Sequence, residues 1–180
     1  MNTDLQIAEW INQHRIKELD GLFIFLTDTA GAIAYAIPII LIFYALFKKN
    51  TQLRMKGLQI LSSVLLTAII VTIIKNIIRR KRPYEVDKLI EKLSFGGGYS
   101  FPSGHTADAF AVAISITLVL TSRRWILIPL YIWAVTIAYS RMLLGVHYLT
   151  DILASICISF LCALLMQLLF KKSHKVKSSE

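Results

Sequence analysis

Residues 102–120 read PSGHTADAFAVAISITLVL, a short polar block that runs directly into an apolar segment almost long enough to span a membrane. Polar blocks end or begin other apolar runs in the same way. They are Lys75 with Arg82-Pro83, and Ser140-Arg141 with His147 and Asp151. Charged groups at a membrane boundary are costly unless they have partners, so these blocks indicate a functional site.

The composition of the chain fits a single domain, residues 1–180, made of membrane helices. Of the 180 residues 56% are hydrophobic, and the mean hydropathy is +0.61. The formal net charge of +9 points to nucleic acid in a soluble protein. Here several basic residues flank apolar runs, where they serve as topology signals or contact lipid headgroups. We therefore expect a membrane protein that binds no nucleic acid.

Five apolar runs approach the roughly 20 residues that cross a bilayer. They are Leu22–Phe47, Leu58–Ile78, Ser103–Leu120, Trp125–Leu144 and Tyr148–Phe170. Asp28 and Pro38 interrupt the first run. In residues 1–20, apolar residues such as Trp10 alternate with polar ones such as Asn12, which predicts an amphipathic surface helix; a disordered terminus is the alternative. The predicted fold is an all-α polytopic membrane bundle with five spans, or six if the N-terminal helix inserts.

Five spans place all three polar blocks on one side of the membrane. The other side holds the loop Lys48–Lys56, the Arg123-Arg124 turn and the basic tail of residues 171–180. A count of basic residues does not orient the chain, because the two sides are equal. Once the cations of the polar blocks are set aside, the positive-inside rule makes the tail cytoplasmic. We therefore expect the site at the outer, periplasmic face of the plasma (inner) membrane.

The first block carries three cations at helical spacing. Lys75, Arg79 and Arg82 are spaced i, i+4 and i+7, so they form one cationic stripe if the helix continues. Pro83 disfavours helical backbone at Arg82 and ends the run. Taken alone, the block is better explained as a basic helix end that contacts lipid headgroups.

The second block begins an apolar helix, with Ser103 placed as its N-cap. Unpaired backbone N–H groups and the positive end of the helix dipole favour an anion there, and Gly104 has no side chain to obstruct it. Ordinary helix capping is the alternative, but His105 is a proton donor that the first turn of a membrane helix does not need. Asp108 either holds His105 or a site cation, or is satisfied by a neighbouring helix.

In the third block, His147 and Asp151 are four residues apart and can face one another at a helix start. A carboxylate that accepts the proton of one imidazole nitrogen leaves the other nitrogen free to attack. Arg141 can bind phosphate oxygens with both arms of its guanidinium group. A lone His–Asp pair is usually structural, whereas Ser140, Arg141, His147 and Asp151 together indicate chemistry.

The three blocks together resemble the signature of the type 2 phosphatidic acid phosphatase family. The matching pattern is Lys, six residues and Arg-Pro; then Pro-Ser-Gly-His; then Ser-Arg, five residues, His, three residues and Asp. The resemblance covers about residues 75–151 and implies a helical membrane phosphatase without metal or cofactor. Most membrane members of that family have six spans.

The resemblance also implies a role for each matched residue. His147 attacks phosphorus to give a phosphohistidine, Asp151 orients His147, and His105 protonates the leaving oxygen. Three cations can take the place of metal ions, since phosphoryl transfer depends on positioning and charge stabilisation. A two-metal site needs several carboxylates, and the blocks offer only Asp151. The residues expected to bind substrate are Lys75, Arg82, Ser103, Gly104, Arg141 and, as a further cation, Arg79.

The expected substrate is a lipid phosphate, because the site lies at the bilayer surface. The extra cations Arg79, Arg80 and Lys81 suit a diphosphate, and the resemblance makes undecaprenyl diphosphate the first choice. Phosphatidylglycerophosphate, phosphatidic acid and lipid A phosphates stay open. So do a transporter or scaffold that binds anionic lipid without chemistry, and a haloperoxidase.

Overall fold

The computed structural model describes residues 3–94, 97–119, 125 and 127–177. Its elements are α1 (Thr3–Gln13), the short 3-10 helix η1 (Lys17–Leu19), α2 (Asp20–Phe47), α3 (Thr51–Ile78), α4 (Pro83–Val86), α5 (Gly104–Val119), α6 (Leu127–Leu143) and α7 (Leu149–Lys177). The predicted Arg123-Arg124 turn lies outside the described residues. Each of the five predicted apolar runs corresponds to one of the long helices α2, α3, α5, α6 and α7.

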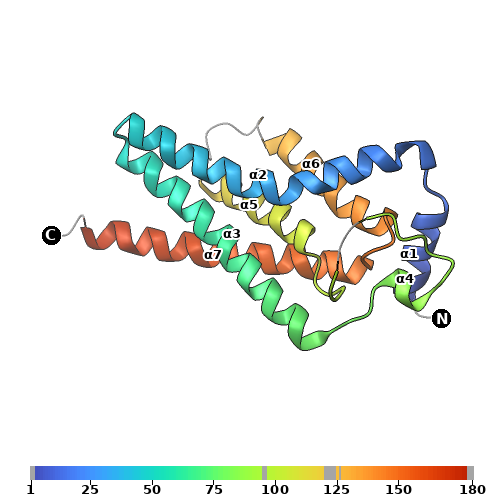
Figure 1. The fold of residues 1–180 in the computed structure, drawn as a ribbon. Coiled ribbons are helices and arrows are strands. Elements are labelled where there is room, and N and C mark those ends of the chain that lie inside the picture. Colours follow the sequence, from blue (N-terminus) through green and yellow to red (C-terminus); the bar gives the residue numbers. More distant parts are fainter. Residues whose placement is uncertain (1–2, 95–96, 120–124, 126, 178–180) are drawn as a thin grey trace.

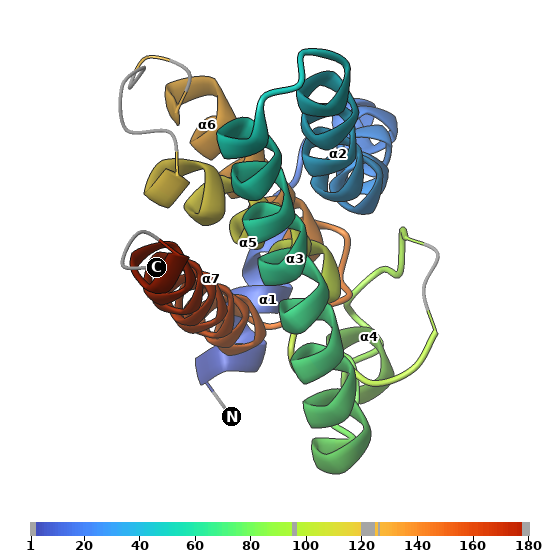
Figure 2. The same ribbon diagram turned by 90° about the vertical axis from the view of Figure 1, so that its left-hand side faces the viewer.

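Helix α5 lies at the centre of the bundle, where it packs against α2, α3, α6 and α7 (Figures 1 and 2). Its buried side chains are mostly small, and Ala109, Ala111 and Ala113 are completely buried. Small residues let the surrounding helices approach closely, which is the usual way that helices pack in membranes. The N-terminus of α5 therefore opens in the middle of one end of the bundle.

The outer faces of the surrounding helices are apolar. Large hydrophobic side chains such as Phe25, Phe43, Ile69, Ile132 and Leu161 are exposed, which suits contact with lipid tails and not with water. Among the described residues, three helical segments are long and apolar enough to cross a bilayer, and α5 and α6 are shorter apolar helices. The predicted all-α membrane bundle is confirmed.

The first helices show how two sequence features are accommodated. Helix α2 continues through Pro38, which is buried inside it, so the proline does not end the helix, as is usual for a proline in a membrane helix. Helix α1 is present, but its buried face is mixed, because the polar residues Asp4 and Asn12 are buried together with Ala8. Asn12 is completely buried and Trp10 is 62% exposed, because Asn12 hydrogen-bonds to backbone groups of neighbouring loops.

The bundle has two chemically different ends. Helices α1 and α4 lie at one end, while the α2–α3 turn and the last turns of α7 lie at the other (Figure 1). The three polar blocks follow α3, precede α5 and connect α6 to α7, so all three lie at the end that holds α1.

Candidate active site

A tight turn between α6 and α7 positions His147. Helix α6 ends at Leu143, and Gly145 reverses the chain with a φ of +74°, a backbone conformation that glycine adopts without strain. The backbone N–H groups of Val146 and His147 then both donate to the carbonyl of Arg141, each at 3.2 Å. The turn therefore folds His147 back against the end of α6, next to Arg141.

His147 and Asp151 form the predicted pair. His147 Nδ1 lies 3.3 Å from Asp151 Oδ2, and that oxygen also accepts hydrogen bonds from the Ser100 hydroxyl and from the Tyr148 backbone N–H. An ionised carboxylate can only accept, so it holds the proton on Nδ1 and leaves Nε2 as a free base. His147 is 2% exposed. Burial lowers its pKa to about 3, because the charged imidazolium loses hydration. The imidazole is therefore neutral near pH 7.

Arg82 enters the same region from the end of α3. Its backbone is extended, as expected before Pro83, and Pro83 begins the short helix α4. The guanidinium group is buried and donates to the carbonyls of Gly97 and Gly98 at 3.1 and 3.0 Å, and to that of Val146 at 3.3 Å. Arg82 thus joins the loop that contains Gly97 and Gly98 to the turn that carries His147.

The predicted cationic stripe of Lys75, Arg79 and Arg82 does not form. Helix α3 ends at Ile78, because Arg79 adopts left-handed backbone with a φ of +51°. The Arg79 side chain is exposed and donates to the carbonyl of Asn76 at 2.9 Å. The structure therefore brings Lys75 and Arg82 together, whereas Arg79 points along its own helix.

Arg141 is the most deeply buried cation of the site, with 1% of its surface exposed. Its Nη1 donates to the hydroxyls of Thr27 at 3.0 Å and Ser94 at 3.2 Å. Its Nε, however, has no hydrogen-bond partner within the described part of the chain. A buried donor without a partner is costly, and an anion bound beside it supplies the missing acceptor.

The start of α5 faces this group of cations. The first N–H to bond within the helix is that of Ala107, which donates to the carbonyl of Ser103 at 3.0 Å, so the three preceding N–H groups lie before the intrahelical ladder. A Cβ added at Gly104 would meet open space. The Ser103 hydroxyl lies 2.9 Å from that of Thr106. Among the described contacts the Ser103 hydroxyl bonds a side chain and not a backbone N–H, so the helix start leaves room for an anion.

The site as a whole is strongly cationic. Lys75, Arg82 and Arg141 are close enough to interact electrostatically with one another and with His105, which is half-buried in the first turn of α5. Arg82 and Arg141 act on His147 in the same way. Within the residues the structure describes, no three His, Cys, Asp or Glu side chains gather as a metal-binding group.

Asp108 faces α2 and not the cations. Its Oδ2 lies 3.9 Å from the position that a Cβ on Gly31 would take, and it interacts electrostatically with Tyr35. The geometry places Asp108 against α2, and neither of the two alternatives that the sequence leaves open is shown by a hydrogen bond of its carboxyl group among the described contacts.

The sequence gives little reason to single out Arg80, which is one of four consecutive cations, residues 79–82. Its Nη1 donates to Asp151 Oδ1 at 2.7 Å, and its Nη2 donates to Asp4 Oδ2 at 2.7 Å. The guanidinium carbon also lies 3.6 Å from the centroid of the Tyr148 ring. Asp4 accepts the backbone N–H of Thr150 at 3.2 Å as well. Arg80 therefore ties the carboxylate of the His147–Asp151 pair to helix α1.

The other end of α1 holds the opposite edge of the site. Asn12 donates to the carbonyls of Leu143 at 2.8 Å and Glu91 at 3.0 Å, and accepts the Glu91 N–H at 2.9 Å. Arg15 forms ion pairs with Asp20 and Glu91, and this pairing lowers the pKa of the Glu91 carboxyl. Buried polar contacts thus explain why α1 turns Asn12 inward.

Comparison with known proteins supports the resemblance of the three polar blocks to a phosphatase signature. A family model described as the PAP2 superfamily matches residues 56–175. The undecaprenyl-diphosphatase of Sulfolobus acidocaldarius is 29% identical over 154 residues, 84% of this chain and 70% of that protein. Undecaprenyl-diphosphatase BcrC of Bacillus subtilis is 30% identical over 154 residues, 84% of this chain and 75% of that protein. A lipid A 4'-phosphatase of Bacteroides thetaiotaomicron is 36% identical over 87 residues, which span 45% of this chain but only 38% of that relative.

Two solved structures share the fold. The crystal structure of Aquifex aeolicus LpxE matches with a TM-score of 0.77 at 26% identity, over 92% of this chain and 95% of that one. A transmembrane PAP2-type phosphatidylglycerolphosphate phosphatase from Bacillus subtilis matches with a TM-score of 0.79 at 23% identity, over 94% of this chain and 85% of that one, and supports the fold alone. The family match takes in all three polar blocks. This multi-pass membrane protein therefore belongs to the PAP2 superfamily, a family of lipid phosphatases.

Proposed function

We propose that the protein removes the terminal phosphate of undecaprenyl diphosphate at the outer face of the membrane, through a phosphohistidine at His147. The observation that carries this proposal is the neutral, buried imidazole of His147, which Asp151 holds with Nε2 free beside Arg82 and Arg141. A neutral imidazole is a nucleophile, and the two guanidinium groups stabilise the charge on the phosphoryl oxygens.

In the first step, His147 Nε2 forms a bond to the terminal phosphorus while the bond from phosphorus to the bridging oxygen breaks. The leaving oxygen, which stays on the lipid, takes a proton from His105. In the second step, water gives a proton to His105 and its oxygen attacks the phosphohistidine, which releases inorganic phosphate and restores His147. Asp151 stabilises the positive charge that develops on the ring of His147 during attack.

The phosphoryl oxygens have an obvious place to bind. Arg141 Nε lacks a partner among the described residues, Gly104 leaves open space at the N-terminus of α5, and Arg141 and Lys75 both interact electrostatically with His105 on the same helix turn. Donors arranged in advance around the developing charge are the main source of rate acceleration in phosphoryl transfer. Binding of the transferred phosphate needs no metal ion in this scheme.

Three arguments favour a lipid diphosphate as substrate. Two relatives that align over 84% of the chain carry the name undecaprenyl-diphosphatase. Lys81, the neighbour of Arg82 in the chain, is exposed and can contact a second phosphate. The positive-inside rule favours an outward-facing site, where a carrier lipid diphosphate is available.

A phosphate-release panel tests the proposal. Purified protein in detergent is given undecaprenyl diphosphate, phosphatidylglycerophosphate, phosphatidic acid or lipid A, each with a strong chelator present. We expect release with the chelator, inhibition by vanadate, and the highest kcat/KM for undecaprenyl diphosphate. A higher kcat/KM for another lipid would mean that this lipid, and not undecaprenyl diphosphate, is the substrate. Lipid A is the main alternative, because a lipid A 4'-phosphatase is 36% identical over 87 residues.

A control separates this enzyme from a protein that only binds anionic lipid. His147→Ala removes the nucleophile and should lower release by a factor of at least about 1,000, while lipid binding persists. Absence of release from the unmodified protein with every lipid would favour the transporter or scaffold. Halide oxidation after addition of vanadate would favour a haloperoxidase.

A further inference from the structure

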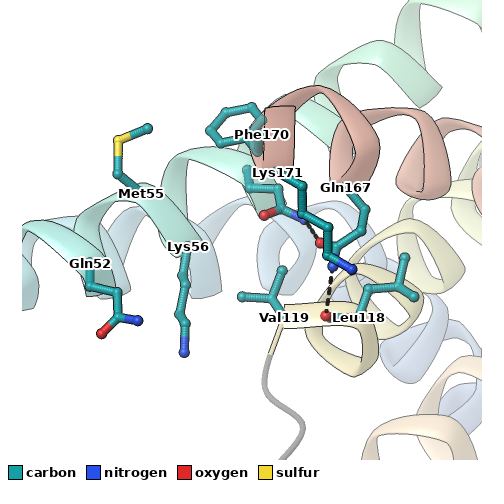
Figure 3. A pocket seen from close by; sticks show the side chains of 9 residues that line it. Gln52, Met55, Lys56, Leu118, Val119, Gln167, Phe170 and Lys171 are labelled. Carbon is teal, nitrogen blue, oxygen red and sulfur yellow. Dashed lines mark hydrogen bonds between the residues drawn. The ribbon is translucent and has the colours of Figure 1, made fainter. Parts of the chain in front are cut away.

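A cavity with apolar walls and two lysines lies at the end of the bundle opposite His147. It has a volume of about 370 Å³ and lies among the N-terminal turns of α3, the C-terminus of α5 and the C-terminal part of α7 (Figure 3). The described residues that line it include no histidine, carboxylate or cysteine, so they offer no nucleophile or general base. Its chemistry is that of a binding site.

Two lysines are the charged groups of this cavity. Lys56 extends from α3 and Lys171 from α7, on either side of Val119 (Figure 3). Two of the three lining amides are engaged, because Gln59 donates to Gln167, which in turn donates to the carbonyl of Leu118 at 3.3 Å. Among the described lining residues, the two ammonium groups and the Gln52 amide are therefore left to contact a ligand, and only the ammonium groups are charged.

No acidic residue of the surrounding helices can neutralise these lysines. The sequence has no Asp or Glu in residues 29–84, 109–150 or 152–179. Within the described ranges, neither lysine takes part in an ion pair. The same end of the bundle also carries Lys48, Lys49, Arg54 and Lys172, all of them exposed. Within the described residues, no carboxylate supplies the counter-charge, which an anionic ligand can provide.

We infer that the cavity binds the headgroup of an anionic phospholipid from the leaflet opposite the active site. The lipid phosphate lies between Lys56 and Lys171, and the glycerol and upper acyl chains lie against Met55 and Phe170. A basic pocket between helix ends at the membrane boundary is well suited to such a headgroup. The apolar walls favour a lipid over free phosphate. This inference does not depend on the reaction at His147.

Lipid-dependent thermal unfolding tests the inference. The protein is unfolded in detergent alone and with dioleoyl-phosphatidylglycerol, dioleoyl-phosphatidylcholine or inorganic phosphate. The variant with Lys56→Gln and Lys171→Gln is compared with a matched control, Lys48→Gln and Lys172→Gln, which makes the same charge change at exposed lysines that do not line the cavity.

We expect phosphatidylglycerol, and not phosphatidylcholine, to raise the unfolding midpoint of the wild type and of the control by several degrees. The cavity variant should lose more than half of this rise and keep normal phosphate release. Gln52→Trp, which fills the cavity without changing its charge, should lose the rise as well and covers the case in which the double variant does not fold. An equal loss in the control would show a general surface-charge effect, and equal stabilisation by inorganic phosphate would show an ion site; either result overturns the inference.

Discussion

Gly145 is the residue on which the position of His147 depends. A Cβ at this position would lie 2.4 Å from the carbonyl oxygen of Glu91, and the φ of +74° is strained for other residues. The left-handed backbone alone costs an L-residue about 1–2 kcal/mol. Backbone atoms cannot move aside as a flexible side chain can, so the whole turn has to shift.

Gly145→Ala should therefore lower kcat by at least about tenfold, with a lower unfolding midpoint, because a shift of about 1 Å at a reacting group is this costly. Gly21→Ala is the matched control, since a Cβ there meets nothing within 4 Å and alanine is the better helix former. Normal kcat in Gly145→Ala, measured as phosphate release, would show that another element positions His147.

Burial of neutral His147 predicts how stability depends on pH. Between the ordinary pKa of 6.5 and the native value of about 3, the unfolded chain binds a proton that the folded protein does not. The free energy of unfolding therefore falls as the pH falls through this window, by up to about 1.4 kcal/mol per pH unit. His147→Gln should flatten the slope by this amount in unfolding experiments at several pH values. Parallel slopes for both proteins would contradict a neutral buried imidazole.

The sequence predicts the site well where a helix sets the spacing. His147 and Asp151 are four residues apart, and the structure brings them together. The predicted stripe of Lys75, Arg79 and Arg82 is wrong, and the contact of Arg80 with Asp151 is missed, because the prediction assumes that α3 continues beyond Ile78. Which of several adjacent arginines reaches Asp151 depends on the residue at which the helix ends, and hydrophobic pattern does not determine that residue.

At the scale of the element, α1 acts on the site through Asp4 and Arg80. Asp4→Asn keeps the shape of the side chain but removes the charge that holds Arg80 against Asp151. We expect kcat to fall about tenfold and KM to change little, because the effect passes through the orientation of His147. Glu9→Gln is the matched control on the same helix. Among the described contacts, Glu9 accepts one hydrogen bond, from Gln13 of the same helix.

The alternative for Arg80 is direct contact with substrate. In that case Arg80→Lys would raise KM with kcat unchanged, and Asp4→Asn would have no effect. In the proposed role, lysine lacks the two separate donors that join Asp4 to Asp151, so Arg80→Lys should lower kcat as Asp4→Asn does.

The long helices are also predictable as elements, because each needs a continuous apolar run. The inward face of α1 is not predictable in this way. Its apolar pattern indicates a helix on the membrane, but Asn12 and Asp4 are buried by hydrogen bonds to residues more than 75 positions away. Such contacts leave no periodic signal in the local sequence.

At the scale of the whole molecule, the end of the bundle that holds the site should face outward. Two single-cysteine variants test this. Gly97→Cys places the thiol in an exposed loop where a Cβ meets nothing within 4 Å, and Lys48→Cys places it at an exposed position at the opposite end. Cys157 is exposed and Cys162 is buried, so both are first replaced by alanine. An impermeant thiol reagent should label the cysteine at 97 in intact cells or, where an outer membrane is present, once that membrane is made permeable.

The cysteine at position 48 should be labelled only after the cytoplasmic membrane is opened. The reverse pattern would place the phosphate-binding end in the cytoplasm. It would also contradict the positive-inside argument, and a site on that side could not reach lipid diphosphate in the outer leaflet.

The contact between Asp4 and Thr150 has a consequence for biosynthesis. The two residues are 146 positions apart, so the ribosome must deliver nearly the whole chain, and the last helix must enter the membrane, before α1 can close against the start of α7. Helices α2 to α6 can be inserted well before that moment, while Asp151 still lacks its arginine clamp. Full activity is therefore expected only when the first and last segments meet, because Arg80 lacks its contact with Asp4 until then.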